Sequence, residues 1–320
     1  EVGKLQQLVT IGETMVSFVP QSNEPLRYGT TLKMCIAGAE SNTAVGIQKL
    51  GGTASFITRL GDDCFGQYIL RMIRAEGVDT AHIKFDPEHP TGIMFKEPLP
   101  NQETAVHYYR LDSAASHMTP DDIPEDSIKS AEIFHFSGIT PILGKSCRDT
   151  IYSAIETAKS GKTAISFDPN IRKKLWKDQD FTAPMKELAS ISDYVLLGLE
   201  EAAVLYGTKE ISRIISSVFS SSSVRFLAVK NGSAGAWVCD SDHTFFIPPV
   251  DCRCIEPTGA GDAFNAGFLS GILKSKPLKI CGTIAAVCGS KATETPGDIE
   301  SLITERELND ILNHISPVYR

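Results

Sequence analysis

Short apolar runs alternate with helical patterns along nearly the whole chain, and this alternation limits the possible folds more than any other feature of the sequence. Segments with apolar residues at helical spacing, such as 41–50, 65–73 and 146–159, separate the apolar runs. Such alternation is typical of βαβ units, which build a mostly parallel sheet covered by helices. The runs that we predict to be strands are 8–11, 54–60, 133–136, 164–167, 194–197 and 226–229.

Two stretches interrupt the alternation, because they carry strand and turn signals without a helical pattern. They span residues 13–36 and about 91–112. We predict that they form a small β-sheet, which covers the open edge of the large sheet as a lid. The serine-rich run Ser216–Ser223 is predicted to be a surface loop. Because no repeat and no interdomain linker is evident, residues 1–320 are expected to form one domain.

The charge and the cysteines exclude several classes of protein. The formal net charge is −8, whereas binding to nucleic acid or to an anionic membrane needs clustered Lys and Arg. The eight cysteines include no C-x-x-C pair, which favours scattered thiols over a zinc site. The sequence shows neither a signal-like N-terminus nor an apolar stretch long enough to span a membrane. We therefore expect a cytoplasmic protein.

The strongest local signal is segment 256–268, which reads Glu-Pro-Thr-Gly-Ala-Gly-Asp-Ala-Phe-Asn-Ala-Gly-Phe. Its proline and glycines predict a tight turn, and the apolar residues that follow predict the start of a helix. Gly259 and Gly261 lack Cβ atoms, so a ligand's phosphates can approach the backbone closely. The first N–H groups of the helix have no partners within the helix and carry partial positive charge. The turn is therefore a candidate anion hole.

Asp262 lies inside this candidate anion hole. A carboxylate is unexpected in a site that only binds phosphate, but a base that removes a proton from an attacking hydroxyl explains its presence. The alternative is a first-turn residue that merely complements the helix dipole, and the motif alone does not decide between the two. The segment matches neither the P-loop nor the Rossmann pattern.

The N-terminal half contains a second group of motifs. They are Ala-Gly-Ala-Glu-Ser-Asn at 37–42, Leu-Gly-Gly at 50–52 and Arg-Leu-Gly-Asp-Asp-Cys-Phe-Gly at 59–66. This group and segment 256–268 resemble the two signatures of the PfkB, or ribokinase-like, family of carbohydrate kinases. The resemblance covers nearly the whole chain. It implies a ribokinase-like three-layer α/β sandwich with a small β-sheet lid, and a kinase that uses ATP and Mg²⁺.

The resemblance implies roles for the residues of the C-terminal signature. Asp262 resembles the catalytic base of the family. Gly259, Ala260 and Gly261 would supply the anion hole, in which Gly259 and Gly261 would also contact the nucleotide.

Three further residues match the family at single positions. Lys230 and Gly232 resemble its nucleotide-binding strand and turn, although without the resemblance they indicate only a strand that ends in a glycine turn. Glu201 matches a glutamate that the family links to Mg²⁺. The alternative for Glu201 is a solvated charge in the first turn of a helix.

Two arginine-containing segments point to a substrate that carries a carboxylate. Segment 106–110 (Val-His-Tyr-Tyr-Arg) closes the second lid stretch, and segment 167–172 (Phe-Asp-Pro-Asn-Ile-Arg) follows a strand at the end where open α/β sheets bind ligands. Two guanidinium groups suit a planar carboxylate better than a neutral sugar hydroxyl. The alternative is two ordinary surface arginines. Asp168 and Asn170 are expected to shape the turn rather than to touch substrate.

Both segments resemble those of the 2-keto-3-deoxygluconate kinases of this family. The resemblance implies that Tyr108, Arg110 and Arg172 bind the acid end of the sugar. Gly38 and Asn42 would hold its hydroxyls. The implied reaction transfers the γ-phosphoryl group of ATP to the C6 hydroxyl of 2-keto-3-deoxygluconate. A fructokinase or another PfkB sugar kinase is the alternative, and a non-catalytic sugar sensor on the same fold is a weaker one, since the Gly-Ala-Gly-Asp run is intact.

Several positions depart from the family pattern. Ala37 replaces the first glycine of a usual pair, and Gly198 stands where the Asn of an Asn-x-x-Glu motif is expected. Glu256 stands at the usual aspartate position, which argues against a monovalent-cation site. The adenine pocket is expected around 281–294, where no matching asparagine is evident. Lid edges in such folds often pair between subunits, so we predict a homodimer through the lid.

Overall fold

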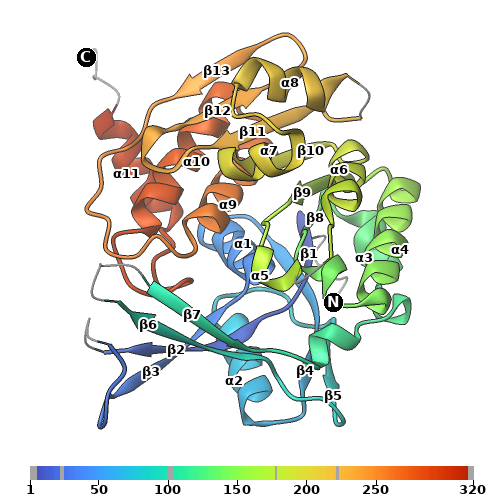
Figure 1. Cartoon of the computed structure of the whole chain (residues 1–320). Helices are drawn as coiled ribbons and strands as arrows, with labels where there is room; N and C mark the ends of the chain where they lie inside the picture. Colours follow the sequence, from blue (N-terminus) through green and yellow to red (C-terminus); the bar gives the residue numbers. More distant parts are fainter. Residues whose placement is uncertain (1–5, 22–24, 100–103, 177–178, 221–222, 316–320) are drawn as a thin grey trace.

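A large sheet forms the centre of the computed structural model, which describes residues 6–21, 25–99, 104–176, 179–220 and 223–315 (Figure 1). Its strands are β1 Leu8–Ile11, β4 Ala54–Gly61, β5 Ile83–Asp86, β8 Ile133–Ser137, β9 Ala164–Asp168, β10 Tyr194–Gly198, β11 Phe226–Lys230, β12 Ala236–Cys239 and β13 Thr244–Ile247. Their order is β13-β12-β11-β10-β9-β8-β1-β4-β5. The strands from β11 to β5 in this order are parallel, whereas β12 and β13 are antiparallel additions. The predicted mostly parallel sheet is confirmed.

Every run that the sequence predicts to be a strand is a strand of this sheet, and most extend one residue beyond the predicted end. The strands that the prediction omits lie at the two edges of the sheet. They are β5 on one side and the hairpin of β12 and β13 on the other. Edge strands are short and only partly buried, so their apolar signal is weak.

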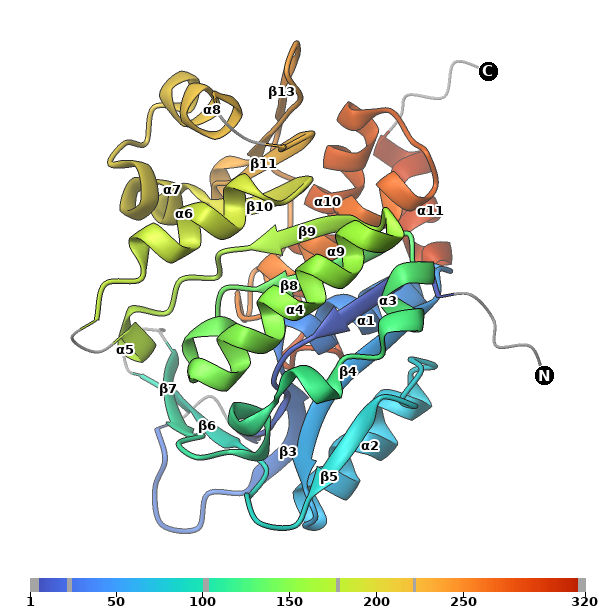
Figure 2. The same cartoon turned by 90° about the vertical axis from the view of Figure 1, so that its right-hand side faces the viewer.

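Helices cover both faces of the large sheet, as Figure 2 shows. Alternate strand residues point to opposite faces, so that Leu8 joins one apolar cluster and Val9 the other. The first cluster packs under α1 Ala39–Lys49, α2 Cys64–Ala75, α9 Ala260–Leu273, α10 Leu278–Ala292 and α11 Glu305–Ile315. The second packs under α3 Glu125–Ser130, α4 Lys145–Gly161, α6 Thr182–Ser190, α7 Leu199–Tyr206 and α8 Ile211–Phe219. Three layers result.

A separate four-stranded sheet lies below α1 in the view of Figure 1. Its strands are β2 Met15–Pro20, β3 Leu32–Ala37, β6 Ile93–Pro98 and β7 Thr104–Tyr109, in the order β3-β2-β6-β7. These strands come from the two stretches predicted to form a small sheet, with β3 running one residue past the predicted limit. Residues 22–24 and 100–103 of those stretches lie outside the described residues.

One local prediction is wrong. The run Ser216–Ser223 was expected to be a surface loop, but residues 216–219 form the end of α8. Ile214 and Val218 of this helix are buried one turn apart, and this spacing outweighs the loop signal of the serines. Residues 221 and 222 lie outside the described residues. Within the described part of the chain, no helix combines the length and apolar character needed to cross a membrane.

Candidate active site

The turn that the sequence predicts to be an anion hole directly precedes α9. Gly259 is the residue before the helix and has φ +82°, a conformation that glycine adopts without strain. Ala260, Gly261 and Asp262 form the first turn of the helix. Backbone N–H groups in a first turn have no partners within the helix, so this end of α9 attracts anions. The structure therefore places Asp262 beside a region of partial positive charge.

The packing of α9 on α1 sets the position of Asp262. Gly46 of α1 meets Ala266 of α9 so closely that a Cβ atom on Gly46 would lie 2.5 Å from the Ala266 Cβ. Asn42 and Asp262 each lie four residues, about one helical turn, before these two contacts. The close approach therefore brings their side chains together, and Asn42 Nδ2 donates a hydrogen bond to Asp262 Oδ2 at 2.8 Å. The first signature of the chain thus contacts the second.

Burial raises the pKa of Asp262 to about 7. The hydrogen bond from Asn42 and the positive charge of Arg172 act in the opposite direction, while the carboxylates of Asp168 and Asp298 raise the pKa further. A carboxylate with a pKa near neutrality is well suited to take a proton from an alcohol. This favours the base over the helix-dipole alternative.

Lys230 lies at the end of β11 and makes a partly buried ion pair. Its Nζ is 2.9 Å from Asp168 Oδ2 and 3.2 Å from Asn265 Oδ1. Asn265 in turn donates to Asp168 Oδ2 at 2.6 Å. The three side chains join β9, β11 and α9, because the carboxyl ends of parallel strands meet at one edge. A Cβ atom on Gly261 would lie 3.8 Å from Lys230 Nζ, so the ammonium group lies close to the anion hole.

The prediction for Asp168 covers only part of its role. Its Oδ1 accepts a hydrogen bond from the Asn170 N–H at 2.9 Å, and Asn170 has φ +40°, so both residues shape the turn as expected. The other oxygen of Asp168 belongs to the Lys230 and Asn265 cluster. Sequence spacing gives no sign of this cluster, since its members lie far apart in the chain.

Glu201 lies in the first turn of α7, where it is not a solvated charge. Its Oε2 accepts from the Gly198 N–H at 2.6 Å, and its Oε1 accepts from the Ile171 N–H at 2.7 Å. Burial and the nearby Asp168 raise the pKa of Glu201. Each carboxylate oxygen has a second lone pair, so Glu201 can still coordinate Mg²⁺ directly or accept a hydrogen bond from a water bound to the ion.

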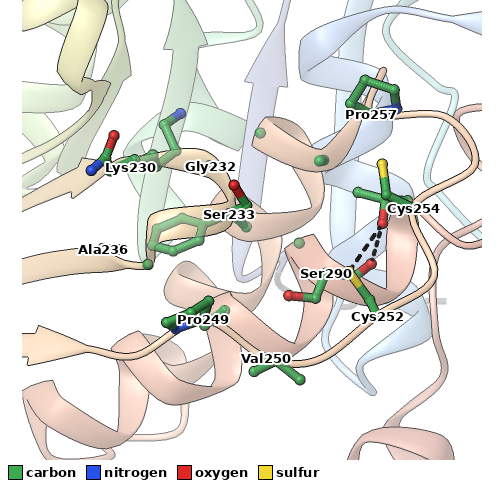
Figure 3. A pocket seen from close by; sticks show the side chains of 18 of the residues that line it. Lys230, Gly232, Ser233, Ala236, Pro249, Val250, Cys252, Cys254, Pro257 and Ser290 are labelled. Carbon is green, nitrogen blue, oxygen red and sulfur yellow. Dashed lines mark hydrogen bonds between the residues drawn. The ribbon is translucent and has the colours of Figure 1, made fainter. Parts of the chain in front are cut away.

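A cavity of about 580 Å³ adjoins the turn before α9 (Figure 3). It lies between the β11 end with the turn at Gly232, where φ is +52°, and the loop that carries Cys252 and Cys254. The predicted nucleotide residues Lys230, Gly232 and Gly261 line it, and so does Ala260. From the region expected to hold adenine, α10 and its end contribute Ala286, Gly289, Ser290 and Thr293. Further lining residues that the sequence did not single out are Ser233, Pro249, Val250, Cys252, Cys254 and Phe264.

Gly38 and Asn42 lie at the start of α1. A Cβ atom on Gly38 would lie 2.5 Å from the Glu13 carbonyl oxygen, so this position requires glycine. Asn42 is 1% exposed, and its Nδ2 donates to both Asp262 and Asp298. Its Oδ1 is buried without a hydrogen-bond partner among the described residues. A buried acceptor of this kind is costly unless a ligand donates to it.

The predicted acid-binding side chains of the small sheet lie close together but are not all free. Arg110 stacks over the Tyr108 ring, with 5.8 Å from its Cζ to the ring centroid. Its Nη2, however, is paired with the buried carboxylate of Glu13, which also accepts from Ser113 Oγ at 2.6 Å. One guanidinium group of the predicted pair is therefore already neutralised within the protein.

Arg172 is the second predicted acid-binding arginine. It is exposed and lies just before the short helix α5 Lys173–Trp176. Its positive charge lowers the pKa of Asp262, so the guanidinium group is close enough to Asp262 to affect its ionisation. Neither Arg110 nor Arg172 lines the cavity of Figure 3.

A buried acidic pair beside the turn is a feature that sequence reasoning did not find as a group. Glu256 and Asp298 both contact Lys96 Nζ from β6, and the distance to Asp298 Oδ1 is 2.9 Å. Glu256 was noted only as a departure from a family pattern. Asp298 follows Pro296 and Gly297, which indicate nothing more than a turn, and Lys96 resembles any charged residue of an exposed strand.

Comparison with known proteins agrees with this geometry. The family model described as "pfkB family carbohydrate kinase" matches residues 5–305. The 2-dehydro-3-deoxygluconokinase of Bacillus subtilis is 33% identical over 309 residues, which cover 95% of each chain. That of Thermoproteus tenax is 31% identical, over 95% of this chain and 94% of the relative. A fructokinase of Escherichia coli is 29% identical, over 93% and 96%.

Solved structures share the fold. An E. coli protein described as a ribokinase II, solved in complex with ATP and Mg²⁺, superimposes with a TM-score of 0.89 at 22% identity, covering 97% of this chain and 100% of that chain. The family match spans almost the whole sequence, both signatures meet at Asp262, and the fold is the ribokinase-like α/β sandwich. The chain therefore belongs to the PfkB family of carbohydrate kinases.

Proposed function

We propose that this kinase transfers the γ-phosphoryl group of ATP to the C6 hydroxyl of 2-keto-3-deoxygluconate. The observation that carries the proposal is the position of Asp262, which lies between the turn beside the cavity and Asn42, with the charge of Arg172 nearby. The relatives at 33% and 31% identity are 2-dehydro-3-deoxygluconokinases, which supports this substrate over the fructose of more distant relatives.

In this mechanism each group of the site has a separate task. Asp262 takes the proton of the attacking hydroxyl. The N–H groups of Gly259, Ala260 and Gly261 stabilise the charge that spreads over the transferred phosphoryl oxygens. Lys230 adds a positive charge beside them, held in place by Asp168.

The nucleotide would occupy the cavity of Figure 3, with its phosphates towards Gly261. Glu201 is the residue that we assign to Mg²⁺, which when bound would supply positive charge that neutralises the phosphates. The hydrogen bonds from Gly198 and Ile171 fix the orientation of this carboxylate before a ligand arrives.

Asn42 and Gly38 would hold sugar hydroxyls, with the unpartnered Asn42 Oδ1 as acceptor. We assign the sugar carboxylate chiefly to Arg172, since Arg110 already pairs with Glu13. Arg110 and Tyr108 would line the same end of the sugar. The neutralised Arg110 is also the observation that keeps fructokinase as a second candidate, because a neutral sugar needs no free guanidinium group.

The test is a side-by-side phosphorylation assay of 2-keto-3-deoxygluconate, fructose, ribose and adenosine with wild type and Arg172→Ala. A charged hydrogen bond contributes roughly 1.5–3 kcal/mol, so KM for the keto acid should rise by about 10- to 150-fold. Residual activity on fructose should barely change. Lys173→Ala removes an exposed charge from the next residue and should affect neither sugar. Equal losses on both sugars in Arg172→Ala would instead indicate a structural role, and the highest specificity for fructose would support the second candidate.

A further inference from the structure

Lys96 is a buried lysine of the small sheet, and neither the cavity nor the proposed sugar site explains it. Its side chain is 2% exposed, whereas most of the other residues of β6 are only partly buried. Burial alone would lower the pKa of its ammonium group, but the carboxylates of Asp298 and Glu256 outweigh burial and raise it. Lys96 is therefore a fixed positive charge inside the protein.

Both partners of Lys96 belong to the support of the anion hole. Glu256 precedes Gly259 by three residues, and its Oε2 accepts from the Gly297 N–H at 3.2 Å. Asp298 packs directly against the glycine turn, since a Cβ atom on Gly259 would lie 3.6 Å from the Asp298 Cα. One ammonium group thus joins the small sheet to the two chain segments that form and support this turn.

Asp298 is connected to Asp262 through the side chain of Asn42. Asn42 Nδ2 lies 3.1 Å from Asp298 Oδ2 and 2.8 Å from Asp262 Oδ2. An amide nitrogen carries two hydrogens, so it can donate to both carboxylates at once. The Lys96–Asp298 ion pair therefore fixes the orientation of the Asn42 side-chain amide, and this amide fixes the position of Asp262 Oδ2.

We propose that Lys96 is a positioning residue for phosphoryl transfer. Its ammonium group takes the place of a bound monovalent cation and holds the small sheet against the glycine turn. It thereby keeps the side chains of Asp298, Asn42 and Asp262 in fixed relative positions. The proposal rests on the proposed role of Asp262 as base. It also explains the glutamate at position 256: the ammonium group fills the space between Glu256 and Asp298, so turnover needs no free alkali-metal ion.

The first measurement compares wild-type turnover in potassium and in tetramethylammonium chloride at equal ionic strength, and we expect no difference. In Lys96→Met the two carboxylates lose their cation, while the side chain keeps a similar length. Turnover at neutral pH should fall about tenfold, with the acidic limb of the pH–rate profile moving up by about one pH unit. Potassium or ammonium ions, which fit between two carboxylates, should restore part of the loss, but tetramethylammonium should not.

The shift of the acidic limb separates positioning from a general loss of structure. The charged groups that face Asp262 are Asp168, Asp298, Arg172 and Lys230. Of these four groups, Asp298 alone is in contact with Lys96, so it is the one whose charge the variant leaves uncompensated. An uncompensated Asp298 disfavours ionisation of Asp262, which moves the limb to higher pH.

Two further variants make the test decisive. Lys33→Met removes a lysine of the same sheet that lies 3.4 Å from Glu300 but is 56% exposed, and it should change nothing. If Lys96→Met does not fold, the double variant Lys96→Met/Glu256→Gln removes one buried carboxylate together with the lysine. The uncompensated charge of Asp298 alone should still move the acidic limb of the pH–rate profile to higher pH. Wild-type dependence on potassium, or a folded Lys96 variant with an unchanged limb and no response to potassium, would overturn the proposal.

Thermal unfolding gives a readout that does not depend on catalysis. Potassium should raise the Tm of a Lys96 variant and leave that of wild type unchanged, because only the variant has a vacant acidic pair. This result would hold even if Asp262 were not the base, so failure of the proposed mechanism and failure of the Lys96 assignment can be told apart.

Discussion

Asp262 lies between two regions of opposite character. On one side charged side chains are paired with one another and are buried, as in Lys96 with Asp298, or largely buried, as in Lys230 with Asp168. On the other side is the cavity of about 580 Å³, whose lining is uncharged apart from Lys230 and Asp251. Buried ion pairs restrict the positions of the groups they join, whereas small neutral side chains leave room for an apolar ring. The difference suggests that the paired charges place the reacting carboxylate, and that the neutral cavity receives the base of the nucleotide.

The largest expected effect comes from removing the carboxylate where the two regions meet. Asp262→Asn should lower kcat by roughly 10²- to 10⁴-fold, since the amide cannot accept the hydroxyl proton. Nucleotide binding, measured by calorimetry, should remain largely intact, because the cavity is unchanged. Asp126→Asn, which alters a first-turn aspartate of α3, is the matched control and should leave kcat unchanged. Near-normal turnover in Asp262→Asn would remove this residue from the mechanism.

A smaller effect concerns the paired charges themselves. Burial raises the pKa of Asp262 to about 7, so kcat/KM should fall about tenfold per pH unit below pH 7, as the base becomes protonated. Asp298→Asn removes a negative charge that contributes to this increase, so the acidic limb should move to lower pH. The measurement is the difference between the two pH profiles at saturating Mg²⁺, since titration of the substrates affects both equally. A limb that stays in place would show that Asp298 does not act on Asp262.

The two regions also differ in how far the sequence predicts them. The turn at Gly259 and the strand end at Lys230 could be identified because glycine spacing and apolar runs are local signals. The strands of the large sheet from β4 to β11 in its order could be predicted for the same reason, whereas β5, β12 and β13 could not. The contacts of Asp298 with Lys96 and Asn42 could not, because each joins residues more than 200 positions apart and each residue alone resembles an ordinary polar position. The same holds for the pairing of Glu13 with Arg110, which removes one of the two free arginines that the sequence suggested.

The smallest expected effect tests the neutral region. Cys252 and Cys254 are exposed and line the cavity, whereas Cys64, at the first residue of α2, is exposed outside it. If the cavity receives the nucleotide, MgATP should slow alkylation of the first two thiols by a maleimide and leave Cys64 unaffected. Peptide mass spectrometry after timed labelling reports all three rates in one sample. Equal protection of the three thiols would indicate a change of overall stability instead of local cover. If MgATP does not change the labelling rates of Cys252 and Cys254, the nucleotide binds elsewhere. The phosphoryl donor would then have to reach Asp262 from a different site beside the paired charges.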